Sequence, residues 1–204
     1  MSKENELVLC LDGVPPFVGV VEDYKFEADP KYMSFQRRGD CETDETKRQI
    51  IPYIIVLDED EGNKLTVLTY KRGRQGNEER LHDLYTFGVG GHINTGDVVF
   101  NGSDTVMNAV FREIEEEIGL NSEDFSFISH IGWVALDSTP VDKVHLGKIY
   151  IAVIEKGSIP KIKPEAGAFE ETKFMGLEEL GALNLEGWSR AILPEIKKLI
   201  TSKI

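Results

Sequence analysis

The chain has 204 residues, of which 41% are hydrophobic and 29% charged, a balance typical of a globular protein with a sizeable core. The formal net charge of −13 argues against general nucleic-acid binding, which needs a basic surface. Small phosphorylated substrates remain compatible with this charge, because a bound cation can reverse the local field.

Cysteine content and the start of the chain indicate the compartment. Cys10 and Cys41 do not have metal-binding spacing. One disulfide between them is an alternative, but two free thiols in a reducing compartment is the interpretation we favour. The first residues lack a signal-peptide pattern, and no apolar run approaches the roughly 18 residues of a membrane span. We expect a cytoplasmic protein without a membrane partner.

The first fifth of the chain contains short apolar runs. Residues 7–11 and 17–21 flank a Gly-Val-Pro-Pro turn and predict a small hairpin. Residues 32–38 predict a helical turn, and residues 39–47 predict a polar linker. We interpret this region as a packing or dimer contact rather than part of a catalytic site.

A strand pair and a basic cluster come next. The β-branched run at residues 50–57 predicts a strand, and residues 65–70 its hairpin partner. The basic residues that follow include Arg72 and Arg80, whose guanidinium groups suit phosphate contacts. Ion pairing with the glutamates at 78–79 is the alternative.

A glycine-rich turn and a helix form the centre of the chain. Residues 85–97 predict a short strand that enters a turn at Gly90 and Gly91, where the backbone can approach a ligand. In the following helix, apolar residues recur every four positions, at Val106, Val110, Ile114 and Ile118. Ser103 or Asp104 supplies the N-cap, and Gly119 supplies the stop.

Three carboxylates share another face of this helix. Glu113, Glu116 and Glu117 stand at i, i+3 and i+4, with neighbouring Cβ atoms roughly 5–6 Å apart. They repel one another, so either solvent or a cation must offset the repulsion. Arg112 neutralises part of the charge, and Mg²⁺, which takes oxygen ligands, would offset it better.

The remaining elements suggest layered α/β architecture. Strands are predicted at 127–136, 144–154 and 173–176, a polar loop at 161–171, and an amphipathic closing helix at 188–202 that contains Pro194. Strands on both sides of a central helix favour an α/β arrangement.

The glycine turn and the acidic helix together resemble the Nudix hydrolase signature. That signature is Gly, five residues, Glu, seven residues, then Arg-Glu-hydrophobic-x-Glu-Glu-x-Gly-hydrophobic. The second half matches from Arg112 to Leu120, and the first half matches at Gly91, with Asp97 in place of Glu. Arg112 lies seven residues further from Asp97 than the signature asks. We interpret residues 98–104 as an insertion, which leaves either Asp97 or Asp104 as the first acidic residue.

The resemblance implies a fold and a domain organisation. The expected fold is a Nudix-type α/β/α (α+β) sandwich with a central mixed sheet, over residues 49–204. Residues 1–48 would be an N-terminal extension that packs on this domain or belongs to it. The chain also resembles a less-studied bacterial and archaeal branch of phosphoesterases without a known substrate. Homodimers are common in the family.

The resemblance also implies a chemistry, namely hydrolysis of a diphosphate linkage in a nucleoside diphosphate bonded to another group. Glu113, Glu116 and Glu117 would hold Mg²⁺ or Mn²⁺, with Glu113 and Glu116 catalytic. Arg112 would orient the carboxylates. The general base would be a helix glutamate or one from a later loop; the loop candidates are Glu165, Glu170 and Glu171, with Glu171 in the favoured position.

The substrate-binding candidates are Arg72, Arg80, Gly91, His92 and His145. For each of the two histidines a structural role is the alternative. His82 and His130 are expected to be structural, and Trp133 is either a core residue or a platform for a base.

Two rival functions remain. A Nudix domain can serve as a catalytically inactive ligand-sensing module, although such domains usually lose the helix glutamates. An isopentenyl-diphosphate-isomerase-like enzyme would need a Cys-x-His active site, which neither Cys10 nor Cys41 provides.

Overall fold

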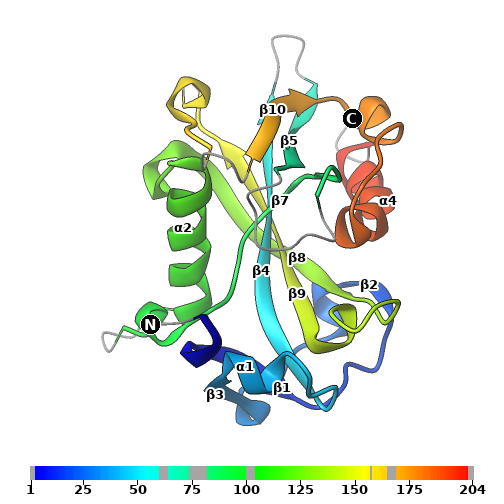
Figure 1. Cartoon of the computed structure of the whole chain (residues 1–204). Coiled ribbons are helices and arrows are strands. Elements are labelled where there is room, and N and C mark those ends of the chain that lie inside the picture. Colours follow the sequence, from blue (N-terminus) through cyan, green and yellow to red (C-terminus); the bar gives the residue numbers. More distant parts are fainter. Residues whose placement is uncertain are drawn as a thin grey trace. The chain divides into compact units, whose positions relative to one another are not determined.

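The protein is described by a computed structural model that covers residues 3–59, 64–73, 82–99, 104–156, 158–164 and 169–201. It forms a mixed α+β fold around a central sheet, as expected (Figure 1). The strand order along the sheet is β10-β5-β4-β9-β8-β2, and β1, β3, β6 and β7 pair off this path. The chain divides into two compact units: the first comprises Met1–Tyr53, Gly90–Glu113 and His130–Tyr150, and the second Ile54–Val89, Ile114–Ser129 and Ile151–Ile204.

The first unit contains the N-terminal strands. β1 (Leu7–Asp12) pairs antiparallel with β3 (Met33–Arg37) and with the start of β4 (Lys47–Glu59). β2 (Gly19–Glu22) pairs with the end of β8 (Phe125–Ala135). The short helices of this unit are η1 (Lys3–Asn5), η2 (Asp23–Lys25), η3 (Pro30–Tyr32), α1 (Arg38–Cys41), η5 (Thr95–Asp97) and η7 (Asp142–Val144).

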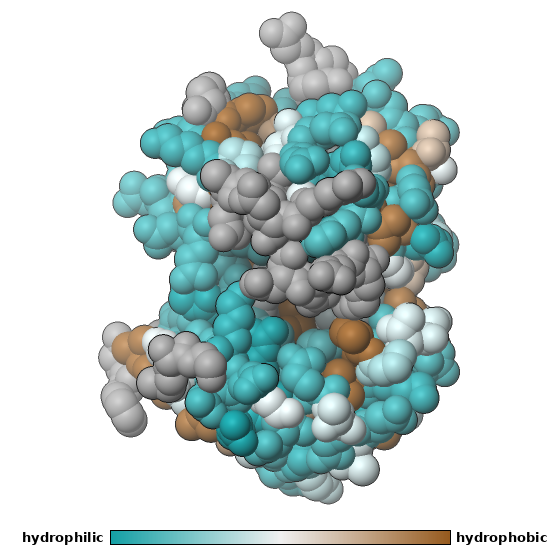
Figure 2. Space-filling model, viewed as in Figure 1, coloured by the Kyte–Doolittle hydropathy of each residue, from teal (hydrophilic) through white to brown (hydrophobic). Residues whose placement is uncertain are grey.

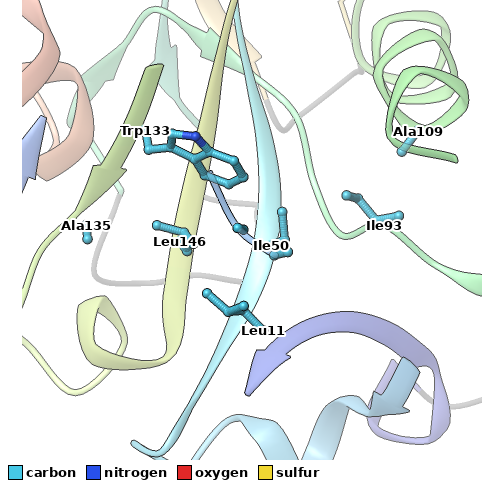
Figure 3. Packing of buried hydrophobic residues seen from close by; sticks show 8 residues of the cluster. Leu11, Ile50, Ile93, Ala109, Trp133, Ala135 and Leu146 are labelled. Carbon is cyan, nitrogen blue, oxygen red and sulfur yellow. The ribbon is translucent and has the colours of Figure 1, made fainter. Parts of the chain in front are cut away.

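The core of the first unit gathers side chains from distant segments. Figure 3 shows Leu11, Ile50, Trp133 and Leu146 from four strands, with Ile93 from the glycine-rich loop. Trp133 is only 3% exposed and belongs to this cluster, which confirms the core interpretation over base stacking. Burial of such large apolar side chains is the main driving force that holds these segments together.

The second unit is built around β5 (Leu65–Arg72). β5 pairs antiparallel with the end of β4, with β10 (Phe169–Met175) and with β6 (Tyr85–Thr86). β7 (Gly88–Val89) pairs with β4. The helices of this unit are η6 (Ser122–Asp124), η8 (Ile159–Lys161), α3 (Leu177–Leu180) and α4 (Gly187–Thr201). β9 (His145–Ile154) and α2 (Thr105–Ile118) contribute residues to both units.

Several local predictions for the N-terminal region were wrong. Residues 7–11 and 17–21 do not form a hairpin, since β1 pairs with β3 and β4, whereas β2 pairs with β8. Pro15 and Pro16 lack backbone donors, which disfavours a tight hairpin turn between them. Residues 32–38 are mostly strand rather than helical turn, because Phe35 lies opposite Leu9 of β1. The proposed linker contains α1, and β10 begins at Phe169, inside the predicted loop.

The surface agrees with the charged composition. Hydrophilic residues cover most of the face shown in Figure 2. Within the part of the chain that the structure describes, no helix is long and apolar enough to cross a membrane.

A buried carboxylate closes the end of η6. Asp124 is 1% exposed and accepts hydrogen bonds from the Lys161 ammonium, from Ser158 Oγ at 2.9 Å and from the backbone N–H of Asn121 at 3.0 Å. These bonds, above all the one from Lys161, lower the pKa of Asp124 from 3.8 to about 2. A carboxylate whose pKa is lower in the folded state stabilises the fold above its unfolded pKa.

We expect this contribution to be lost as the pH falls from about 4 to about 2, through the folded pKa of Asp124. Asp124→Asn should therefore lower the Tm most at neutral pH, and the Tm difference from the wild type should shrink towards pH 2. Thermal unfolding followed by circular dichroism across this range measures the difference. A Tm difference that stays constant with pH would contradict the assignment.

Candidate active site

The acidic helix α2 begins and ends as the sequence predicts. Asp104 caps its start, since its Oδ1 accepts the N–H of Val106 at 2.9 Å. Gly119 follows its last turn with a φ of +71°, a conformation that glycine adopts without the steric cost of a side chain. The residues Val110, Ile114 and Ile118 are fully buried. The apolar face therefore fixes the rotation of the helix, and with it the direction of the carboxylates.

Arg112 is held by Asp97 in a bidentate ion pair. Arg112 Nε lies 2.7 Å from Asp97 Oδ1, and the second guanidinium nitrogen lies 2.9 Å from Oδ2. Asp97 is 3% exposed and also accepts the backbone N–H of Asn94 at 2.8 Å, in the capping box of η5. Of the two candidates for the first acidic residue, Asp97 thus contacts Arg112, whereas Asp104 is a helix cap.

The same guanidinium group holds Glu113. Arg112 Nη1 donates to Glu113 Oε1 at 2.6 Å, and Nη2 donates to the carbonyl oxygen of His92 at 2.8 Å. The bond to Asp97, followed by the charge of Glu113, raises the pKa of Arg112. Arg112 therefore orients a carboxylate of α2 and ties it to the glycine-rich loop.

Gly91 leaves room for the Glu113 carboxylate. A Cβ atom at position 91 would lie 2.7 Å from both carboxylate oxygens, closer than Cβ contacts in proteins allow. Glu113 is only 7% exposed, so its carboxylate has little space to move away. Glycine at this position is therefore required by the close approach of the Glu113 carboxylate, whereas the approach to a ligand stays a prediction.

The other two carboxylates lie further along α2. Glu116 is exposed and Glu117 is half-buried.

Burial, opposed by the charge of Arg72 and reinforced by that of Glu117, raises the pKa of Tyr70. The Tyr70 hydroxyl donates to the carbonyl oxygen of Gly88 at 2.6 Å, so it fixes the strand that enters the glycine turn.

The predicted general base lies in an exposed position of β10. Glu171 Oε2 accepts a hydrogen bond from the Tyr85 hydroxyl at 2.6 Å, and Glu171 Oε1 lies 3.6 Å from Lys71 Nζ. The bond from Tyr85 is the main cause of the lowered pKa of Glu171, which keeps this carboxylate ionised at neutral pH. Its φ of +51° falls at a register shift between Glu170 and Lys173.

The basic candidates are only partly described. The Arg72 guanidinium lies over the ring of Tyr70, 5.4 Å from its centroid. Arg80 and Glu165 lie outside the described residues.

The two predicted substrate-binding histidines lie side by side. Their ring centroids are 5.6 Å apart in an edge-to-face arrangement. His92 Nε2 lies 2.9 Å from Gln49 Oε1, and His145 Nδ1 lies 2.8 Å from the carbonyl oxygen of Val141. Burial, with the charge of Arg38 next, lowers the pKa of His92 well below 6.5, so its imidazole is neutral at pH 7.

His130 packs as a structural residue. It lies 3.0 Å from the carbonyl oxygen of Gly132 and edge-on to Trp133 at 5.4 Å between ring centroids. Burial is the main cause that lowers its pKa.

The helix carboxylates have the donor chemistry that Mg²⁺ prefers, because all three offer oxygen. The glycine cradle beside Glu113 and the ion pair of Arg112 fit a metal site whose ligands need orientation. Among the described residues, however, the group of three ligating side chains whose ligand atoms all lie within 4.8 Å of one another is Glu42, His92 and His145, and the α2 glutamates do not form such a group.

Sequence reasoning missed Glu42 altogether. It follows α1 in a region that we interpreted as a polar linker, and only the tertiary structure places it beside His92 and His145. The contact of Gln49 with His92 had no local signal in the sequence either. Neither residue has a distinctive spacing to either histidine.

The chain resembles a known protein family and known structures over most of its length. The family model of the NUDIX domain matches residues 47–196. Protein YmaB of Bacillus subtilis (strain 168) is 33% identical over 159 residues, which cover 77% of this chain and 75% of that protein. The crystal structure of Tm1382, a candidate Nudix hydrolase, is 26% identical, covers 95% of this chain and 100% of its own, and superposes with a TM-score of 0.74.

More distant structures share the fold alone. The NUDIX domain of Shewanella oneidensis NrtR, solved with ADP ribose, is 12% identical with a TM-score of 0.55, and covers 75% of this chain and 88% of its own. The Caenorhabditis elegans Ap4A hydrolase is 13% identical with a TM-score of 0.53, and covers 76% of this chain and 98% of its own. With the Arg-Glu-x-x-Glu-Glu helix and the glycine cradle in place, the chain belongs to the Nudix family and is a hydrolase of pyrophosphate bonds.

Proposed function

We propose that this protein hydrolyses the diphosphate linkage of a nucleoside diphosphate bonded to another group, with Mg²⁺ as cofactor. The observation that carries the proposal is the Asp97–Arg112–Glu113 chain of charge-assisted bonds beside Gly91. It holds one carboxylate of α2 in a fixed position, which a solvated acidic face would not need. Glu113, Glu116 and Glu117 would bind the cation.

The cation would neutralise charge on the diphosphate oxygens and assist the activation of water. Arg112 holds Glu113 in place, and Gly91 lets the loop backbone approach that carboxylate. Glu116 is the exposed carboxylate of the set, so a cation from solvent would reach it at the helix surface. Arg72 and Arg80 are proposed to contact substrate phosphates.

Glu171 is proposed as the general base, with a helix glutamate as its competitor. Its lowered pKa keeps the carboxylate deprotonated, as a base must be, but also weakens its pull on a proton. Glu171→Gln should therefore separate the two candidates through the pH profile of kcat.

A substrate screen tests the proposed function. Phosphate or nucleotide release should be followed with and without Mg²⁺ over ADP-ribose, nucleotide sugars, dinucleoside polyphosphates and nucleoside triphosphates. ADP-ribose and dinucleoside polyphosphates come first, because the NUDIX domain of NrtR was solved with ADP ribose and another protein of this fold is an Ap4A hydrolase. We expect turnover of at least one compound that is abolished by EDTA and restored by Mg²⁺. Turnover of none of them, or turnover that EDTA leaves intact, would contradict the proposal.

The isomerase-like alternative requires a reactive thiol, and the two cysteines are poorly suited to that role. Cys10 and Cys41 are free and buried, with their Sγ atoms 3.3 Å apart. Burial and the bond to Cys41 raise the pKa of Cys10, so its thiol stays protonated.

We expect the double variant Cys10→Ala/Cys41→Ala to keep hydrolytic turnover within about twofold of the wild type, because a buried, protonated thiol is not a nucleophile. Steady-state kinetics at saturating Mg²⁺ measure this, with circular dichroism as the control for folding. Loss of turnover in a folded variant would support the isomerase-like alternative, in which a thiol takes part in the reaction.

A further inference from the structure

A second set of metal-ligating side chains meets in the first unit, apart from the glutamates of α2. One ligand atom each from Glu42, His92 and His145 lies within 4.8 Å of the other two. Glu42 follows α1, His92 follows the glycine pair, and His145 opens β9. These segments are far apart in the sequence, so the fold itself brings the three side chains together.

Each imidazole uses one ring nitrogen for a hydrogen bond to an oxygen atom. The carbonyl oxygen of Val141 only accepts, so His145 Nδ1 donates to it and Nε2 keeps its lone pair. Gln49 Oε1 accepts likewise from His92 Nε2, which leaves the lone pair on Nδ1. Metal-binding histidines show this arrangement, in which the second nitrogen donates to an oxygen and fixes the tautomer.

Glu42 provides the negative charge and an entry path. Its Oε1 accepts the Nε–H of Arg38 at 3.1 Å, which orients the carboxylate. The Glu42 side chain is 37% exposed, whereas His145 is only 8% exposed. An ion can thus approach His92 and the buried His145 from the side of Glu42.

We propose that Glu42, His92 and His145 bind a divalent first-row transition-metal ion such as Zn²⁺, at a site distinct from the Mg²⁺ site of α2. Two imidazoles and one carboxylate suit Zn²⁺, and three protein ligands leave a fourth position open for water or a ligand. Mg²⁺ prefers oxygen ligands, so the two sites differ in selectivity.

Occupancy of this site would fix the glycine-rich loop. The carbonyl oxygen of His92 accepts a hydrogen bond from Nη2 of Arg112 at 2.8 Å. The loop is therefore already bonded to the residue that orients Glu113. An ion held by His92 would join that loop to the segment after α1 and to β9. The site is therefore a cross-link between three segments.

Binding can be measured without any substrate. The chelator-treated full chain should be titrated with Zn²⁺, and with Co²⁺ as a spectroscopic probe, in the presence of excess Mg²⁺. We expect about one ion per chain and visible Co²⁺ bands of nitrogen-ligated, low-coordinate geometry. At a Zn²⁺ concentration about a hundred times its Kd, the Tm should rise by about 5–10 °C.

Glu42→Gln and His145→Ala should each weaken Zn²⁺ binding at least about tenfold, since either change removes a ligand. Glu116→Gln is the matched control and should bind Zn²⁺ like the wild type. The Glu42 side chain is 37% exposed and glutamine has the same shape, so Glu42→Gln should fold even if the loss of the buried His145 does not allow folding.

Absence of Zn²⁺ binding by the wild type would overturn the proposal, as would binding that survives both ligand variants. Loss of binding in Glu116→Gln, with Glu42→Gln unaffected, would place the ion at α2 instead. Mg²⁺-dependent turnover is a separate readout. An enzyme that turns over with Mg²⁺ but binds no Zn²⁺ would reject this site and leave the proposed function standing.

Discussion

Replacing Glu116 with glutamine is expected to lower kcat by about 100- to 1000-fold, which corresponds to several kcal/mol of transition-state stabilisation by a bound cation. The amide keeps the size of the side chain but removes the negative charge that a divalent cation needs. Glu116 is exposed on α2, so the variant should fold as the wild type does. Steady-state kinetics with the substrate identified by screening, at varied Mg²⁺, measure both kcat and the Mg²⁺ requirement.

Glu115→Gln is the matched control for this variant. Glu115 is also exposed, but it lies two residues after Glu113 and hence on a different face of α2. The same charge change there should leave kcat within about twofold of the wild type, since single exposed charges contribute little. Equal losses in both variants would indicate a general effect of helix charge and would remove the case for a metal site at α2.

Replacing Gly91 with alanine is expected to lower kcat/KM by about 10- to 100-fold, the range seen when residues that orient metal ligands are changed. The new Cβ would lie 2.7 Å from both Glu113 carboxylate oxygens, so either this carboxylate or the loop must move. Glu113 would then lose the geometry of its 2.6 Å bond to Arg112. Kinetics and Mg²⁺ activation curves should both change.

Gly176→Ala provides the comparison, because a Cβ at position 176 would meet Glu179 at an ordinary 3.5 Å. We expect that variant to keep its kcat/KM and its Mg²⁺ activation. Full activity of Gly91→Ala would show that Glu113 does not need its present position, and would weaken the assignment of Glu113 as a ligand.

The sequence predicted best where the signal is local. Helix α2 follows from apolar residues every four positions and from Gly119, and its burial confirms that pattern. The strand pair of β4 and β5 follows from two β-branched runs joined by a short polar segment. In both cases the deciding interactions join residues close in sequence, so periodicity and turn residues are sufficient.

Prediction failed where the partner is remote. β2 pairs with β8, where Val21 lies opposite Trp133, and no local pattern announces this pairing. Residues 33–37, inside the predicted helical turn, form strand β3 because β1 offers them an edge to pair with.

The candidate active site shows the same contrast between contacts that are local in the sequence and contacts that are remote. The Arg112–Glu113 pair and the glycine beside it were readable from the motif. The choice between Asp97 and Asp104 was not, because the contact of Arg112 with Asp97 joins residues 15 positions apart in the sequence. Glu42 could not be associated with His92 and His145 at all, since only the tertiary fold joins them.

The two partners of the Asp97–Arg112 ion pair are not interchangeable. Asp97 Oδ2 accepts from Arg112 and also from the backbone N–H of Asn94, so one carboxylate serves as both anchor and turn cap. Exchanging the two residues would keep a pair of opposite charges. The backbone N–H of Asn94 would then face a guanidinium group, which cannot accept its hydrogen bond. Substitutions that keep the ion pair are therefore expected at position 112 alone. Position 97 should be occupied only by acidic residues in homologues.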